Sequence, residues 1–176
     1  TLGRFRNLLI KNGLQEKLFA QVVVALMERG LILKKGTIVD STIISAPSST
    51  KNKEKKRDPD AHQVKKGNTW HFGYKAHIGV DKDSGLVHTV EATSANVHDV
   101  AETSKLLTGE EEAVYGDSGY LGAEKRDDAI IRNEAGHKIK YRINRRPSQV
   151  KKLSKSGQYA AKKAEHAKSS VRAKVE

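Results

Sequence analysis

The nine residues TIVDSTIIS, at positions 37–45, have the composition of a buried β-strand with an acid inside it. The β-branched residues on both sides of Asp40 suit a packed, pleated surface, whereas Asp is a residue that strands avoid. Removing an unpaired carboxylate from water is costly unless a cation compensates it or the strand end is open to solvent. Asp40 is therefore a candidate functional residue; a strand-edge acid bonded to the backbone is the alternative.

Helical periodicity precedes this strand. Apolar residues recur at helical spacing over residues 2–12 and again from Leu14 onward, and Asn12-Gly13 and Gly30 are typical helix stops. The pattern predicts a short helical hairpin within an N-terminal segment, residues 1–36. Two helices joined by a tight turn are more often a plain hairpin than a helix-turn-helix reader of DNA.

The strand is followed by a basic insertion and a β-hairpin. Residues 46–68 are rich in Lys, Ser, Asp and Pro and lack the apolar residues that a core requires. We expect them to be a mobile insertion. Residues 69–93 alternate between apolar and polar around the turn Asp83-Ser84-Gly85, which predicts two antiparallel strands.

Helices and strands are then expected to alternate. Asp99 is placed to cap a helix over residues 99–107, and residues 113–117 are typical of a buried strand, parallel to the first because a helix intervenes. The remaining expected elements are a helix at 122–133, a strand at 137–143, a basic loop at 145–158 and a helix at 159–176. This order predicts an α/β fold, with a mixed sheet flanked by helices.

The charge of the chain limits its partners. Its 176 residues include 33 Lys and Arg against 21 Asp and Glu, a formal net charge of +12, which favours a polyanion and above all nucleic acid as a partner.

There is no cysteine in the sequence, which excludes disulfides and thiolate metal sites. No apolar run approaches the roughly 18 residues of a membrane span, and no secretory signal opens the sequence. We therefore expect no membrane partner and a cytoplasmic protein.

Clusters of basic residues in the expected loops favour contacts with DNA phosphates over a merely solubilising surface. The few aromatic residues favour duplex DNA over single strands. Lys75 and His77 share one strand face, which fits either phosphate contact or a solvated sheet surface. The candidate DNA-contacting residues are Lys51, Lys53, Lys55, Lys56, Arg57, Lys65, Lys66, Lys75, His77, Arg145, Arg146, Lys151, Lys152 and Arg172.

Two further acids join Asp40 as candidates. Asp117 ends an expected strand, at the carboxyl edge where open α/β sheets place their sites, and Glu176 lies four residues after Arg172. Three carboxylates from distant parts of the chain fit a site for two Mg²⁺ or Mn²⁺ ions that would cleave a phosphodiester. Alternatively, Asp117 is a turn former and Glu176 a solvated partner of Arg172.

A resemblance to a known family favours the interpretation of the three acids as a metal site. The run from Gly36 to Gly85, the HDV and YGDSGYLGA segments and the closing SSVRAKVE are similar to the DDE-class transposases of bacterial insertion sequences, in particular the insertion-sequence-five group. This resemblance covers nearly all of the chain. It implies a ribonuclease-H-like catalytic domain over residues 37–176, two divalent metal ions, and cleavage and strand transfer of DNA.

The resemblance also implies the roles of single residues. Asp40 in IVDST matches the first catalytic acid and metal ligand of these transposases, Asp117 in GDSGY the second, and Glu176 the third. Residues 1–36 correspond to the remnant of a DNA-binding region. In these transposases the third segment has Tyr where Ser169 stands and a basic residue after the Glu, so we expect the chain to be a fragment that ends at the third acid.

The expected activity is that of a metal-dependent transposase. Its partners would be the double-stranded DNA of transposon ends and target, bound by a homo-oligomer, near the bacterial nucleoid. Two alternatives stay open: a non-catalytic DNA-binding remnant of a transposase, and a ribonuclease-H-like nuclease that cuts without joining.

Overall fold

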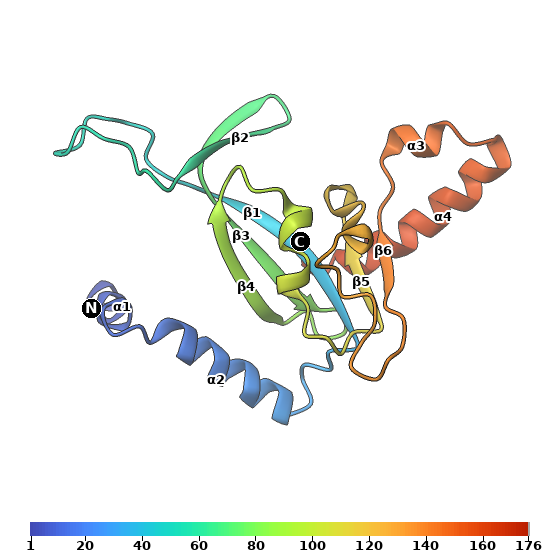
Figure 1. Cartoon of the computed structure of the whole chain (residues 1–176), viewed down its shortest axis with the longest axis horizontal. Helices are drawn as coiled ribbons and strands as arrows, with labels where there is room; N and C mark the ends of the chain where they lie inside the picture. The colour runs from blue at the N-terminus through green and yellow to red at the C-terminus, as the bar shows by residue number, and fades with distance from the viewer. Residues whose placement is uncertain (176) are drawn as a thin grey trace. The chain divides into compact units, whose positions relative to one another are not determined.

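The computed structural model describes residues 1–175 (Figure 1). The chain forms two compact units, Thr1–Leu33 and Lys34–Glu176. Unit 1 contains α1 (Leu2–Lys11) and α2 (Gln15–Glu28), the predicted helical hairpin. The turn between them uses Gly13 at a φ of +60°, a conformation that favours glycine. No side chain of either helix is buried.

Unit 2 is built on a six-stranded mixed sheet with helices beside it, which confirms the predicted fold class and agrees with a ribonuclease-H-like core. Its strands are β1 (Gly36–Ser45), β2 (His62–Lys66), β3 (Thr69–Asp81), β4 (Val87–Ser94), β5 (Ala113–Gly116) and β6 (Lys140–Ile143). β1 is antiparallel to β3 and parallel to β5, and β5 is parallel to β6. The predicted parallel pairing of the first strand with residues 113–117 is confirmed.

The β3–β4 hairpin is also confirmed, and its turn is organised by a residue that the sequence analysis did not single out. The buried carboxylate of Asp81 accepts hydrogen bonds from the backbone N–H groups of Asp83 (3.0 Å) and Ser84 (2.8 Å), and from the Ser84 hydroxyl (3.0 Å). Gly85 follows at a φ of +75°. This side chain therefore fixes the path from β3 into β4.

The predicted helix at 99–107 is wrong. Two short 3-10 helices replace it, η1 (Asp99–Glu102) and η2 (Ser104–Leu106). Asp99 does not cap a helix, because its carboxylate binds Lys75 instead. The hydroxyl of Thr103 donates to the carbonyl of Val100 at 3.0 Å, a local bond that competes with a regular helix.

The predicted helix at 122–133 is wrong as well. Only η4 (Ala123–Lys125) forms there, after η3 (Ser118–Tyr120). Arg126 is already extended, and the backbone N–H of Ile139 donates to the carbonyl of Ile131. Residues 131–139 therefore form a turn that brings Ile131 and Ile139 together. Too few residues remain between Arg126 and this turn for the predicted helix.

A proline and a serine determine where the two C-terminal helices begin. The predicted basic loop contains α3 (Pro147–Lys151), whose first residue is a proline with a φ suited to a helix start. α4 (Lys155–Arg172) begins earlier than predicted because Ser154 caps it, accepting a hydrogen bond from the N–H of Gly157 at 3.2 Å. No helix in the described part of the chain is long and apolar enough to span a membrane.

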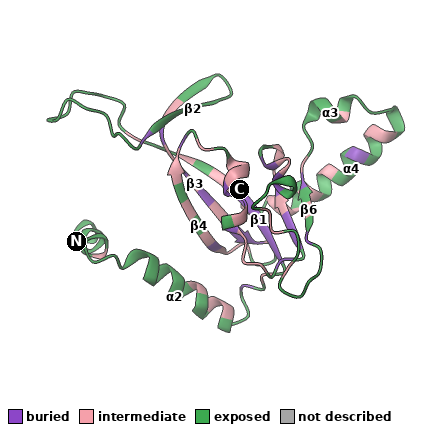
Figure 2. Cartoon of the chain, viewed as in Figure 1, coloured by how far each residue is buried: buried purple, intermediate pink, exposed green. Residues whose placement is uncertain are grey.

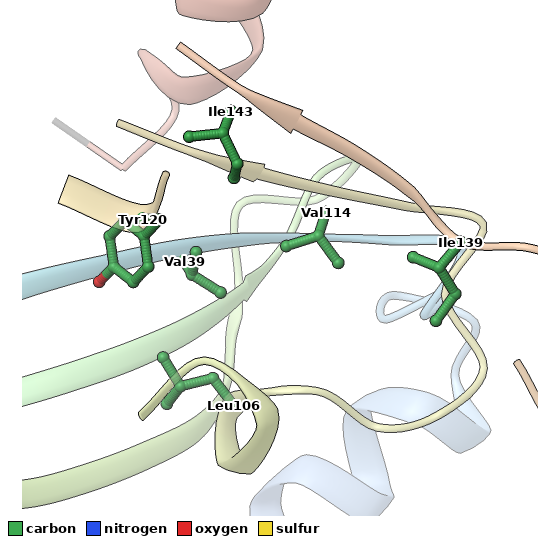
Figure 3. Packing of buried hydrophobic residues seen from close by; sticks show 6 residues of the cluster. All are labelled: Val39, Leu106, Val114, Tyr120, Ile139 and Ile143. Carbon is green, nitrogen blue, oxygen red and sulfur yellow. The ribbon is translucent and has the colours of Figure 1, made fainter. Parts of the chain in front are cut away.

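The core lies on one face of the sheet (Figure 3). It consists of Val39, Leu106, Val114, Tyr120, Ile139 and Ile143. Purple, buried residues are concentrated in the central strands, while β2 and the long segment before it are mostly green and exposed (Figure 2). The sheet centre is therefore the rigid part of unit 2 and can serve as the platform for a site.

Candidate catalytic site

Asp40 and Asp117 lie level with one another across the central parallel pair. Ile38 of β1 is the partner of Tyr115 in β5, and each acid follows two residues later. Side chains two residues apart in a strand point to the same face. Folding therefore brings the two carboxylates to one face at the carboxyl end of β5, as a shared site requires.

Asp40 is half-buried. One of its carboxylate oxygens, Oδ1, accepts a hydrogen bond from the backbone N–H of Ser41 at 2.9 Å. Burial raises the pKa of Asp40 above its ordinary value of 3.8, and the negative charge of Asp117 raises it further, while Ser41 and Arg172 lower it. A carboxylate kept out of water beside a second acid is an electrostatically unfavourable arrangement that a cation would relieve.

Asp117 caps the turn that follows β5. Its Oδ1 accepts a hydrogen bond from the backbone N–H of Gly119 at 2.7 Å. A Cβ atom on Gly119 would lie only 2.9 Å from that oxygen, so a glycine is needed for the turn to hold the carboxylate in this position. The turn-former alternative is thus correct as local structure, and it also fixes the acid next to Asp40.

α4 approaches the same face. Arg172, in its last turn, is one of the charges that lower the pKa of Asp40. Its Nη1 donates to the side-chain oxygen of Asn144, at 3.4 Å. Glu176, the third predicted acid, lies outside the described residues. The described part of α4 therefore leads toward the two aspartates without placing the third ligand.

The donors present suit a hard divalent cation as far as the structure describes them. Two carboxylates from β1 and β5 provide oxygen ligands, which Mg²⁺ and Mn²⁺ prefer. Among residues 1–175, no three His, Asp or Glu side chains are close enough together to hold a metal ion. The structure therefore brings two of the three predicted acids together, and the described residues supply no third ligand.

Lys75 and His77 do not form the predicted phosphate-contacting face. Both are buried, His77 completely. Nζ of Lys75 donates to Oδ1 of Asp99 at 2.9 Å and to the carbonyl of Val97 at 2.7 Å. Neither side chain can reach a DNA phosphate from this position. The prediction failed because the alternation of β3 shows which residues share a face but not that η1 covers that face.

Most other candidate DNA-contacting residues are exposed. The basic arm, which we define as residues 46–68, extends from the end of β1 and returns through β2 (Figure 1). It carries seven Lys or Arg residues against three acids. Nζ of Lys65 lies 6.0 Å from the ring centre of the exposed Trp70. The charge of Lys66, which lies at the turn between β2 and β3, also acts on Asp40.

Residues 32–176 match the family model described as the transposase DDE domain. The chain belongs to this family. The match includes β1, which carries Asp40, and β5, which Asp117 directly follows. The transposase DDE domain family therefore accounts for the whole of the sheet on which the two level carboxylates lie.

One solved structure similar to this DDE domain is a piggyBac transposase synaptic complex with hairpin DNA. The identity is 16%, and the TM-score is 0.39. The alignment covers 69% of this chain and 26% of the piggyBac chain, so the DDE domain described here spans about a quarter of the length of that protein.

Proposed function

We propose that this chain is the catalytic domain of a bacterial insertion-sequence transposase of the insertion-sequence-five group, which cleaves and joins double-stranded DNA with divalent cations. The observation that carries the proposal is the level placement of Asp40 and Asp117 on paired strands, far apart in sequence. Membership of the DDE domain family supports it. The cofactor would be two Mg²⁺ or Mn²⁺ ions, with Glu176 as the third ligand.

Different residues of the chain would have different roles in this reaction. Asp40 and Asp117 would bind the ions from one face of the sheet, and the ions would activate a water or a 3′-hydroxyl and neutralise the leaving oxygen. Arg172 lies near enough to Asp40 to act on the same phosphate. The exposed lysines of the basic arm would hold the duplex backbone. The protein would contribute positioning and charge neutralisation, without a covalent intermediate.

The proposed DNA surface combines the basic arm with the exposed end of α3, the loop before it and Arg172 in the last turn of α4. It contains Lys51, Lys53, Lys55, Lys56, Arg57, Lys65, Lys66, Arg145, Arg146, Lys151, Lys152 and Arg172. Lys75 and His77 are left out because they are buried. Transposon ends and target DNA would be its ligands, and a homo-oligomer would bring two ends together.

Replacing either acid tests the proposal. Asp40→Ala and Asp117→Ala should each abolish Mn²⁺-dependent cleavage of supercoiled plasmid, because each removes a metal ligand. Both should bind duplex DNA as the native chain does, because the basic arm is unchanged. Asp128→Asn, which alters an exposed acid paired with Arg126, is the matched control and should cut normally.

Three outcomes distinguish the candidate functions. Native cleavage by Asp40→Ala would refute the assignment of the metal ligands. DNA binding without any Mn²⁺-dependent cleavage, in the native chain and in one extended past residue 176, would favour the non-catalytic remnant. Cleavage without joining of a labelled pre-cut DNA end to a target plasmid would favour a nuclease.

A further inference from the structure

A buried ion pair lies on the opposite face of the sheet from Asp40. Lys75 and His77 are partners of Ile43 and Ser41 in the β1–β3 register, so they share a face with Ser41 and not with Asp40. The Lys75 side chain is 10% exposed and that of its partner Asp99 is 27% exposed. Burying two charges is costly, and a well-packed apolar pair would stabilise the fold as well. The ion pair therefore calls for a functional explanation.

The partner of Lys75 reaches the turn that carries Asp117. Oδ1 of Asp99 binds Lys75, while its other oxygen, Oδ2, would lie 3.6 Å from a Cβ atom on Gly119. The same Cβ would lie 2.9 Å from Oδ1 of Asp117. Asp99 and Asp117 thus border the same small space beside Gly119, one from η1 and the other from the end of β5.

A buried hydroxyl faces the same group of acids. Tyr120 is 1% exposed, and its hydroxyl has no hydrogen-bond partner of acceptable geometry among residues 1–175, although the Ser41 side chain is near. The charges of Asp99, Asp40 and Asp117 all act on it, and together with burial they raise its pKa. An unpaired buried hydroxyl is unfavourable, so its retention beside these acids calls for an explanation.

The imidazole of His77 is also buried and lies beside Asp99. Its Nε2 lies 2.8 Å from the hydroxyl of Thr93, which itself donates to the carbonyl of Ser94. That hydroxyl can therefore only accept from His77, so Nε2 carries the hydrogen. Nδ1 is then a buried acceptor, 3.8 Å from Oδ1 of Asp99 and without a hydrogen-bond partner in the described chain.

We propose that Asp99 and Tyr120 are positioning residues for the Asp40–Asp117 site, with Lys75 fixing Asp99 against the Gly119 turn. The inference rests on the proposed function, because it assigns these residues to the same metal-binding carboxylates. Asp99 borders the turn that aims Asp117, and the Tyr120 hydroxyl lies beside Ser41, whose backbone N–H donates to Asp40.

The backbone N–H of Gly119 provides a direct measure of this positioning, because it donates to Asp117. In ¹⁵N-labelled protein without metal, Asp99→Asn should move the Gly119 amide proton toward its random-coil position. Mn²⁺ should then bind about tenfold more weakly, or worse, as is usual when an outer partner of a metal ligand is removed. Asp128→Asn should change neither quantity.

A double variant separates positioning from charge balance. Lys75→Met alone leaves the partly exposed Asp99 carboxylate without its ion-pair partner, and the protein should unfold at lower temperature. Lys75→Met combined with Asp99→Asn removes both charges and should recover the native melting temperature. The Gly119 resonance and the Mn²⁺ affinity should stay altered in the double variant. Their return to native values would overturn the role of Asp99.

Tyr120→Phe isolates the hydroxyl, because the ring that packs in the core is kept. Thermal stability should be equal to or higher than that of the native chain, since an unpaired buried group is removed. The Mn²⁺-dependent cleavage rate should nevertheless fall about tenfold. Unchanged cleavage would overturn the role of Tyr120.

The two proposals can fail separately. If the native chain and Asp40→Ala titrate Mn²⁺ alike, the proposed function fails. The Gly119 resonance would still report, without metal, whether Asp99 holds the Asp117 turn. If Mn²⁺ binding requires Asp40 but the Asp99→Asn variant matches the native protein in both measurements, only the positioning role fails.

Discussion

Asp40 carries an electrostatic cost in the folded protein. Its pKa is raised mainly by burial, with a further contribution from Asp117, so the folded state binds a proton more tightly than the unfolded chain. The contribution of Asp40 to stability should therefore be greatest below the ordinary value of 3.8 and should be lost as the pH rises through the higher folded pKa. A residue kept at such a cost is typical of a functional site.

Asp40→Asn should consequently stabilise the protein at neutral pH while abolishing cleavage. The neutral amide avoids the burial of a charge, so the melting temperature should rise at pH 7. Below about pH 3.5 both proteins carry a neutral side chain there, and the difference should disappear. Thermal unfolding followed by circular dichroism across this range is the measurement. A destabilised variant at pH 7 would contradict the explanation.

Among single residues, the sequence singled out Asp40 and Asp117, which the structure brings to one face, but it did not reveal what surrounds them. Asp40 was conspicuous because strands avoid aspartate, and Asp117 because it ends a strand. Asp99 was assigned to a helix cap, since its partner Lys75 is 24 residues away on another element. Only a correct placement of η1 over the sheet would have revealed that pair.

Among the elements, the 3-10 helices depend on close contact with the sheet. A Cβ atom on Gly79 in β3 would lie 2.5 Å from the carbonyl oxygen of Leu106 in η2 and 3.0 Å from the His88 ring. The nearer atom belongs to the backbone and cannot rotate away. Gly79 thus allows η2 to bring Leu106 into the core beside Val39.

Gly79→Ala should therefore push η2 away from the sheet. We expect a decrease of about 1–3 kcal/mol in the free energy of unfolding, as for other overpacked cores. Urea unfolding at pH 7 is the measurement. Gly3→Ala, where a Cβ atom meets nothing within 4 Å, is the control and should be neutral or slightly stabilising. A native midpoint for Gly79→Ala would show that η2 packs more loosely.

Elements with strong local patterns were predicted, and those determined by long-range contacts were not. β1 and the β3–β4 hairpin follow from β-branched residues, alternation and a glycine turn. The segments 99–107 and 122–133 have helical composition, yet side-chain bonds such as that of Thr103 and the bridge between Arg132 and Lys138 hold them in other shapes. β2 was missed because its pairing with β3 outweighs a composition typical of loops.

For the whole molecule, the net charge of +12 is concentrated where DNA binding is proposed. The basic arm is exposed, and its lysines make no ion pairs within the described residues. Charges of this kind bind phosphates through release of counterions, so affinity falls with salt in proportion to the number of phosphates that the protein neutralises. The arm should therefore determine much of the salt dependence.

Replacing Lys53, Lys55 and Lys56 by Ala should weaken duplex binding and make the slope of log K against log salt shallower by up to about 2.7, because each neutralised phosphate contributes about 0.9. Fluorescence anisotropy over a salt series measures this slope. The control replaces Lys125, Lys138 and Lys140, three exposed lysines outside the proposed surface. Equal changes in both variants would show that total charge, and not the arm, governs binding.

The level placement of Asp40 and Asp117 has a consequence for biosynthesis. Strand β5 follows β1 by more than 60 residues, and the two acids meet only once these strands pair. A growing polypeptide still on the ribosome can complete the β3–β4 hairpin before the proposed Asp40–Asp117 site exists. If the site cuts DNA as proposed, a polypeptide that is still being translated could not cut before β5 has emerged and paired with β1.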